Sequence, residues 1–257
     1  MMSPVEIHVV PGLPEIRPGD DLGVIIGDCL EKAGLGLRDG DIVTSAHKVV
    51  SKAEGQIVRL ADVEPSAEAL AYAERLAKDA RKVEVVLRES VRVVKAFRHP
   101  GQNEGTMICE HRLGLISANA AVDESNTGED GTVILLPRDP DASAERIQKA
   151  LEQRFGVSIG VMLTDTFGRP WRLGQVNIAI GLAGVPSVKS EKGKADAYGR
   201  RLMVTEPAFA DEIAAASGLV VRKAGNTPVT LFRGLEWEKT QSRAAEMLRP
   251  AGEDMFR

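Results

Sequence analysis

The chain has 257 residues, 43% of them hydrophobic, so it can bury a full core as one large domain or as two intimately joined ones. Its 33 basic and 37 acidic residues give a formal net charge of −4 without a basic block, which argues against a nucleic-acid partner. No apolar run reaches the roughly 20 residues of a membrane span, and MMSPVEIHVVPG lacks the regions of a signal peptide. A cytoplasmic protein with no membrane partner is expected.

The first elements alternate between strand and helix. A strand over 6–10 leads into a loop at 11–16, where two prolines prevent regular structure. Asp20 or Asp21 can cap a helix that has the 3.6-residue apolar period and ends at Gly34. A strand at 41–46 follows. The two cysteines, Cys29 and Cys109, belong to no metal-spaced pair and are expected to be small buried hydrophobes.

The run HKVVSKAEG at 47–55 collects two lysines, a serine and a glutamate directly after the strand at 41–46. A lysine run is commonly a solvated face. Its position after an apolar strand favours a ligand-binding segment instead, because an α/β sheet often binds its ligand at the carboxyl ends of its strands.

The middle of the chain combines helices with a hairpin. We expect a helix from Pro65-Ser66 to Ala80, a short helix within 83–91 and a strand at 92–97. Segments 106–112 and 114–119 form a plausible hairpin. The hairpin exits into NAAVDESN at 119–126, which is either a loop of Asx turns or a source of oxygen ligands from Asp123 and Asn126.

The last part carries four strands and three helices. The strands are predicted at 132–137, 159–163, 176–181 and 229–234. The helices are predicted at 142–155, closed by Gly156, at 207–221, and as a short amphipathic tail at 240–250.

Asp165-Thr166 follows the buried strand at 159–163 and precedes a Gly-Arg-Pro turn. A carboxylate and a hydroxyl at a strand end are hard oxygen ligands suited to Mg²⁺ or Mn²⁺. Arg169 and Arg172 follow, and cations beside a metal carboxylate suit a phosphate substrate. The alternative is an ordinary polar turn with surface arginines.

Several strong motifs are absent from the sequence, among them the Walker A pattern, the G-x-S-x-G elbow, H-E-x-x-H and zinc-type Cys/His spacing. Three oxygen-rich turns remain, at Asp123 with Asn126, at Asp165 with Thr166 and at Glu54, together with lysines and arginines. Phosphoryl transfer needs charge neutralisation and positioning more than a covalent nucleophile. The residues alone therefore indicate a metal-dependent enzyme that acts on phosphates.

Seven strings in order over nearly the whole chain resemble the coenzyme F420-0:L-glutamate ligase family. Members of that family use GTP and a divalent cation to join L-glutamate, through its amino group, to a carboxylate of the deazaflavin F420, and then add γ-linked glutamates. The strings are GLPEI (12–16), SKAEG (51–55), NAAVDESN (119–126), LLPRDPDASA (135–144), LTDTFGRPWRLG (163–174), DAYGRRL (196–202) and ADEIAAA (210–216).

The resemblance implies an α+β protein, with a mixed α/β two-lobed ligase fold over 1–257 as a single domain and an intertwined homodimer. It implies two divalent ions, Mg²⁺ or Mn²⁺, with K⁺ as a further candidate, GTP as co-substrate, and F420-0 and L-glutamate as substrates. By position, the metal ligands are Asp123, Asp165 and Thr166. The nucleotide-binding positions are Leu13, Pro14, Glu15, Ile16, His47, Lys48, Lys52, Asn126 and the turn Lys223, Ala224, Gly225, Asn226, Thr227 and Pro228.

Two residues are assigned to catalysis by neutralising the transferring phosphate. Lys52 follows from the resemblance, and Arg169 is inferred from its turn. The chain departs from the family where Asn119-Ala120-Ala121 replaces Asn-Ala-Gly, where His47-Lys48 replaces small hydroxyl residues, and in the short 223–228 turn.

Two rival functions stay open. The same ligase chemistry could act on another carboxylate such as a folate, because a fold does not fix its acid. The chain could also be a catalytically inactive nucleotide-binding homologue, which the altered 223–228 turn would favour.

Overall fold

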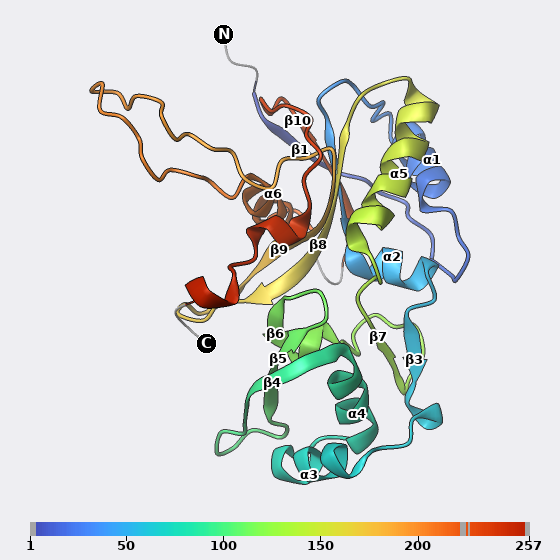
Figure 1. Cartoon of the computed structure of the whole chain (residues 1–257). Coiled ribbons are helices and arrows are strands. Elements are labelled where there is room, and N and C mark those ends of the chain that lie inside the picture. Colours follow the sequence, from blue (N-terminus) through green and yellow to red (C-terminus); the bar gives the residue numbers. More distant parts are fainter. Residues whose placement is uncertain (1–3, 222–224, 226, 255–257) are drawn as a thin grey trace. The chain divides into compact units, whose positions relative to one another are not determined.

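A computed structural model describes residues 4–221, 225 and 227–254 of the chain (Figure 1). The chain divides into two compact units. Unit 1 comprises Met1–Ile16, Asp20–Val50 and Arg138–Met247, and unit 2 comprises Arg17–Gly19, Ser51–Pro137 and Leu248–Arg257. Both units contain helices and β-sheet, which confirms the α+β class.

Unit 1 is built on a five-stranded sheet of order β1-β10-β2-β8-β9. Only β2 and β8 pair in parallel, and the other three pairs are antiparallel. β2 and the first half of β8 are buried, as their runs of apolar and β-branched residues predict. The strands are β1 Glu6–Val9, β2 Ile42–Ala46, β8 Gly160–Gly168, β9 Gln175–Ala183 and β10 Val229–Arg233.

Helices cover both faces of this sheet (Figure 1). α5 (Pro140–Phe155) packs on β8 and β9, and α1 (Leu22–Lys32) packs on α5. α6 (Phe209–Ser217) packs on the other face, in a core with Met162 and Phe232. The strands that carry the candidate site are therefore packed between α5 on one face and α6 on the other.

The ends of the helices follow the capping rules that the sequence suggests. Asp21 caps α1 by accepting from Val24 N at 3.1 Å, and Gly156 closes α5 with a positive φ of 67°. Close packing also constrains the sequence, because a Cβ built on Gly23 of α1 would lie 2.3 Å from the Ala150 Cβ of α5. Glycine is therefore required where these two helices meet.

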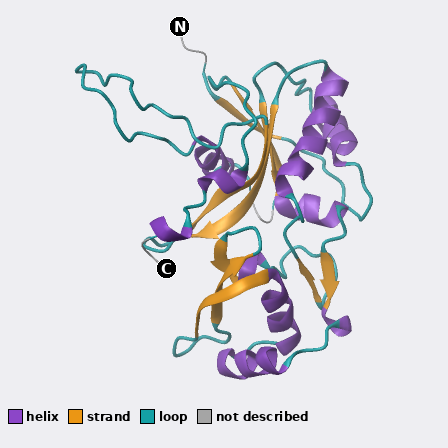
Figure 2. Cartoon of the chain, viewed as in Figure 1, coloured by secondary structure: helices purple, strands orange, loops and turns teal. Residues whose placement is uncertain are grey.

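A long loop over 186–208 joins β9 to α6 and extends away from the sheet (Figures 1 and 2). Its two limbs are held together by backbone hydrogen bonds such as Lys189 N to Pro207 O and Glu191 N to Thr205 O, both at 2.9 Å. Near its tip Tyr198 is 96% exposed, and Val204 is 83% exposed. The loop therefore presents apolar side chains to solvent.

Unit 2 contains two small sheets and two main helices (Figure 2). Helix α4 packs against α3 and β4, and its valines join Leu76 and Met107 in a separate core. α2 (His47–Ala53) connects β2 to β3 across the boundary between the units. The elements are β3 Ile57–Arg59, the 3₁₀ turn Leu60–Asp62, α3 Ala67–Leu76, α4 Ala80–Glu89, β4 Ser90–Phe97, β5 Thr106–His111, β6 Ile116–Ala118, the 3₁₀ turn Asn119–Ala121 and β7 Thr132–Ile134.

Three expectations from the sequence are wrong in detail, and helix α2 at the start of the run at 47–55 was not expected. α3 ends at Leu76 instead of Ala80 because Ala77 adopts a left-handed φ of 52°. β8 continues to Gly168, so Asp165 lies inside the strand and not at its end. The tail forms two short 3₁₀ turns, Ala244–Met247 and Ala251–Glu253, instead of one amphipathic helix.

Cys29 and Cys109 are both buried, as expected. Burial raises the pKa of the Cys109 thiol, which keeps it in the unreactive protonated form. Within the part of the chain that the structure describes, no helix is long and apolar enough to cross a membrane.

Candidate functional site

Three predicted site segments meet at one edge of the unit 1 sheet. β2 and β8 run in parallel with Ala46 opposite Thr164, so His47 and Asp165 come next to each other in this register. β10 starts at the same edge, and Ala46 N donates to Pro228 O at 2.9 Å. The structure thus brings together His47, Asp165 and the described end of the predicted nucleotide turn.

Asp165 is the carboxylate of this edge. Its side chain is 20% exposed, and its Oδ1 accepts from Thr166 N at 2.6 Å. His47 Nε2 lies 3.3 Å from the same oxygen, and the histidine is 2% exposed. β9 carries one unpaired residue, Ile180, opposite Leu163 and Thr164, and such bulges often adjoin active sites.

Thr166 lies beside Asp165 in sequence but faces the other side of the sheet. Successive side chains of a strand alternate, and Thr166 shares the α6 side with Met162. Its Oγ1 donates to Asn177 Oδ1 at 3.3 Å, and Asn177 Nδ2 donates to Ser217 Oγ at 3.2 Å. The hydroxyl therefore donates its proton inward and keeps its oxygen lone pairs for a ligand, but on the face opposite the Asp165 carboxylate.

Lys48 and Lys52 lie four residues apart on α2 and therefore share one helix face. Both side chains are partly buried. In the loop before α1, Leu13 and Ile16 are buried while Pro14 and Glu15 are exposed, so only the middle of this predicted nucleotide segment faces solvent. Lys223, Ala224 and Asn226 lie outside the described residues, Gly225 is exposed, and Thr227 and Pro228 are partly buried.

Arg169 occupies the turn between β8 and β9. Its Nε lies 3.5 Å from Gly174 O, and its Nη2 donates to Leu173 O. These bonds engage part of a guanidinium that carries five N–H donors, so the side chain retains donors for an anion. Trp171 and Leu173 at the same turn are 76% and 96% exposed.

Asp123 is held in unit 2 by main-chain and side-chain bonds. Its backbone pairs with Ile134 of β7, with Ile134 N donating to Asp123 O at 2.8 Å. Ser125 donates to its carboxylate twice, from N to Oδ1 at 2.7 Å and from Oγ to Oδ2 at 3.1 Å. The Asx turn that the sequence left open is therefore present, and it orients the carboxylate. Asn126 is exposed and has a positive φ of 59°.

A left-handed turn precedes Asp123. Asn119, Ala120 and Ala121 have φ values of 52°, 49° and 58°, a conformation that costs a residue with a Cβ about 1–2 kcal/mol each. Asn119 Oδ1 is buried without a hydrogen-bond partner among the described residues. Strain and an unsatisfied oxygen in one short segment are typical of functional sites.

Ala121→Gly is expected to stabilise the protein by about 0.5–1 kcal/mol, because relief of the left-handed strain exceeds the entropy that glycine adds to the unfolded chain. Urea unfolding followed by circular dichroism measures the change. Ala71→Gly, at an exposed helical position of α3, is the matched control and should destabilise by about 1 kcal/mol. Loss of stability in both variants would contradict the strain at Ala121.

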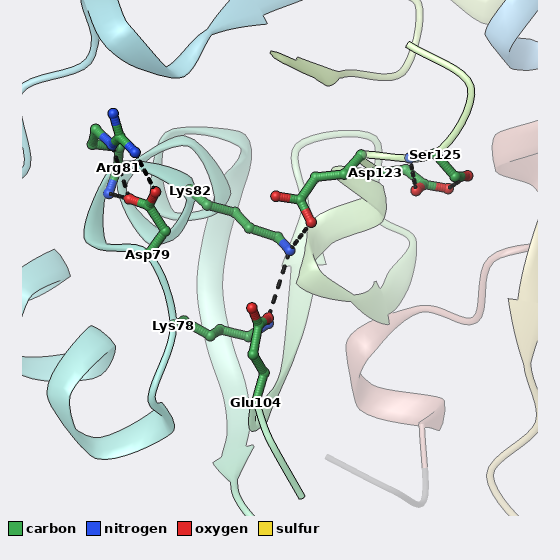
Figure 3. Close-up of polar contacts among 8 residues, drawn as sticks. Lys78, Asp79, Arg81, Lys82, Glu104, Asp123 and Ser125 are labelled. Carbon is green, nitrogen blue, oxygen red and sulfur yellow. Dashed lines mark hydrogen bonds and ion pairs between the residues drawn. The ribbon is translucent and has the colours of Figure 1, made fainter. Parts of the chain in front are cut away.

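A cluster of lysines and glutamates lies next to Asp123 and includes Glu124, the residue that follows it (Figure 3). Lys82 of α4 is 8% exposed, and its Nζ lies 2.5 Å from Glu124 Oε2 and 3.7 Å from Glu104 Oε2. Lys78 donates to Glu104 at 3.0 Å, and this hydrogen bond lowers the pKa of Glu104. A buried ammonium thus fixes the residue that follows Asp123.

Lys82 lies outside the site predicted from the sequence. A signal was present, because Lys82 lies three and four residues before Val85 and Val86 on the buried face of an amphipathic helix. A lysine on such a face needs an acidic partner, since an unpaired buried charge is costly. Glu124, beside the predicted ligand Asp123, is that partner.

The donor sets fit Mg²⁺ or Mn²⁺ in part. Asp123 and Asp165 each offer a carboxylate fixed by hydrogen bonds from its neighbours. Across the described ranges, no group of three or more His, Cys, Asp or Glu side chains could enclose an ion. Mg²⁺ is commonly held by one or two carboxylates while substrate phosphates and water complete its shell.

Carboxylates oriented by hydrogen bonds and a strained backbone turn are features typical of enzymes. Comparison with known proteins identifies the particular family. The model of the F420-0:Gamma-glutamyl ligase family matches residues 12–234. The chain therefore belongs to this family and is a ligase that joins an acid to an amino acid.

Three relatives named coenzyme F420:L-glutamate ligase match nearly the full chain. The protein of Methanopyrus kandleri is 43% identical over 258 residues, covering 98% of each chain. That of Methanothermobacter thermautotrophicus is 41% identical over 96% of this chain and 97% of its own. That of Archaeoglobus fulgidus is 38% identical over 98% of this chain and 96% of its own. The resemblance seen in the sequence is confirmed.

Proposed function

We propose that this protein is a GTP-dependent ligase that adds L-glutamate to coenzyme F420-0 and then adds further γ-linked glutamates. The observation that carries the proposal is the full-length similarity to relatives named for this reaction. The fixed carboxylates of Asp165 and Asp123 support it, because they suit the ions that GTP requires.

The reaction proceeds in two steps. In the first, a carboxylate oxygen of F420-0 attacks the γ-phosphorus of GTP, the bond to the β-phosphate oxygen breaks, and GDP leaves. In the second, the uncharged amine of L-glutamate attacks the carbonyl carbon of the acyl phosphate, inorganic phosphate leaves, and the nitrogen loses a proton to solvent. The product is an amide.

The residues of the chain supply charge and position. Asp123 and Asp165 would hold the divalent ions, which would supply positive charge to the phosphate oxygens. Lys52 on α2 and Arg169 in the β8–β9 turn neutralise the charge that develops on the transferred phosphate. The loop at 13–16, Lys48, Asn126 and the 223–228 turn hold the nucleotide. Thr166 is proposed as a further ligand on the other face of β8, with an oxygen whose proton is directed to Asn177.

The proposal includes a homodimer. Exposed Tyr198, Met203 and Val204 on the loop over 186–208 support it, because large apolar side chains exposed on one segment can mark an association surface. Light scattering of the purified chain tests this part.

Release of inorganic phosphate from GTP tests the reaction as a whole. Turnover that requires both F420-0 and L-glutamate, with a product heavier by one or more glutamyl residues in mass spectrometry, is the expected result. Turnover with a folate or another acid instead of F420-0 would favour a ligase of different acid specificity. GTP binding without turnover on any acid would contradict the ligase reaction and favour an inactive homologue.

A further inference from the structure

The imidazole of His47 is buried, although the resemblance assigns His47 to the nucleotide. The residue is 2% exposed, so its ring offers almost no surface to a ligand. Its Nε2 instead faces Asp165 Oδ1 at 3.3 Å. The ring therefore lies against the carboxylate at the centre of the candidate site.

The fold fixes this contact from both sides. His47 is the first residue of α2 and directly follows β2, while Asp165 lies in β8, the parallel neighbour of β2. Ala46 is opposite Thr164 in that ladder, so the next residue on each strand comes into register. Both residues are thus attached to paired backbone, which leaves little freedom in the distance between them.

The contacts also select one oxygen of the carboxylate. Thr166 N donates to Asp165 Oδ1 at 2.6 Å, and His47 Nε2 approaches the same atom. With two nitrogens at Oδ1, the carboxylate plane is set and Oδ2 is the oxygen that would remain for an ion. Groups that orient a metal ligand in this way commonly change metal affinity by about 10–100-fold when they are removed.

We infer that His47 is a positioning residue that orients Asp165 for a divalent cation, and that its side chain does not contact the nucleotide. The inference rests on the proposed function, because it takes Asp165 as a metal ligand. Loss of the contact between His47 and Asp165 should therefore weaken metal binding and lower turnover, while the affinity for GTP stays the same.

Two amide variants of the full-length chain separate this role from general packing. In His47→Gln the amide nitrogen can reach the place of Nε2, whereas in His47→Asn the shorter side chain withdraws it. Mn²⁺ titrated in the presence of GDP, with free Mn²⁺ read by electron paramagnetic resonance, reports metal affinity. We expect His47→Asn to bind Mn²⁺ about tenfold more weakly and His47→Gln to stay within about threefold of the unchanged chain. In steady-state assays His47→Asn should lower kcat while the KM for GTP stays unchanged.

His111 provides a matched control in unit 2. It is fully buried, its Nε2 lies 3.2 Å from Glu89 Oε2, and neither residue belongs to the proposed site. His111→Asn should lower the melting temperature without changing Mn²⁺ affinity. Asp165→Asn serves as the reference for loss of the metal ligand itself.

The outcomes distinguish the inference from the function on which it rests. If Asp165→Asn weakens Mn²⁺ binding while His47→Asn and His47→Gln bind it equally well, the positioning role is wrong and the metal site stands. A raised KM for GTP in His47→Asn with unchanged Mn²⁺ affinity would show that the ring contacts the nucleotide and would contradict the positioning role. If Asp165→Asn binds Mn²⁺ like the unchanged chain, the proposed metal site is wrong and the inference is overturned with it.

Discussion

Asp165→Asn is expected to lower kcat by about a hundredfold or more, because a hard divalent cation requires the negative charge that the amide lacks. A hundredfold corresponds to about 2.7 kcal/mol of lost transition-state stabilisation. The substitution keeps the size of the side chain and an oxygen that can accept from Thr166 N, so the local fold should persist. Phosphate release from GTP, measured with F420-0 and L-glutamate present, gives the effect.

Asp211→Asn is the control for this change. Asp211 belongs to α6 in the same unit, and its Oδ1 accepts from Ala179 N at 2.9 Å. Burial raises the pKa of Asp211, which means that the site disfavours the charged form of this side chain. An uncharged asparagine, which keeps an oxygen for Ala179 N, should therefore be tolerated. Asp211→Asn should therefore keep near-normal turnover.

Thermal melting adds a check that is independent of turnover. Mn²⁺ with GDP should raise the melting temperature of the unchanged chain, since a ligand that binds only the folded state stabilises it by mass action. Asp165→Asn should show a smaller shift, and higher Mn²⁺ should restore part of it. An Asp165→Asn protein with full turnover and a full metal-dependent shift would rule out the metal site at this residue.

The strands and most helices could be predicted because their signals are local. β2 and β8 are short apolar runs, and Asp21 and Gly156 mark helix ends by side-chain and backbone chemistry. Helix α2 was not predicted because its lysines indicate a charged segment. Val49, Val50 and Ser51 nevertheless form a buried side of the helix. Periodicity is weak in a helix of only seven residues.

The candidate site was predictable in composition but not in arrangement. Oxygen ligands next to strands identified Asp123 and Asp165, yet strand alternation separates Thr166 from Asp165 and depends on the full length of β8. The contact of His47 with Asp165 depends on the pairing of β2 with β8, two strands more than a hundred residues apart in sequence. Local patterns carry no information on such pairing.

Backbone strain was also beyond local prediction. The family resemblance drew attention to Ala121 because glycine is common there, but three consecutive left-handed residues contradict the preference of alanine for right-handed backbone. Tertiary contacts must hold this turn, and Ala120 is indeed 1% exposed in the core of unit 2. A conflict between local preference and structure of this kind is expected at functional segments.

Lys52→Ala is expected to raise the KM for GTP and to lower kcat by about a hundredfold, because a cation near the phosphates acts in both the ground state and the transition state. Alanine is the best helix former, so α2 should stay intact. Lys52→Arg keeps the charge and should retain more activity, although a guanidinium is broader than an ammonium. Steady-state kinetics over a range of GTP concentrations measures both parameters.

Lys149→Ala is the matched control for the loss of a lysine from a helix. Lys149 belongs to α5, its side chain is 71% exposed, and it pairs with Glu145 at 3.1 Å in the helical i, i+4 arrangement. Its removal should leave both kinetic parameters unchanged, since an exposed pair contributes at most about 0.5 kcal/mol. If Lys52→Ala behaves like Lys149→Ala, the SKAEG segment is a solvated helix end and another cation must neutralise the transferred phosphate.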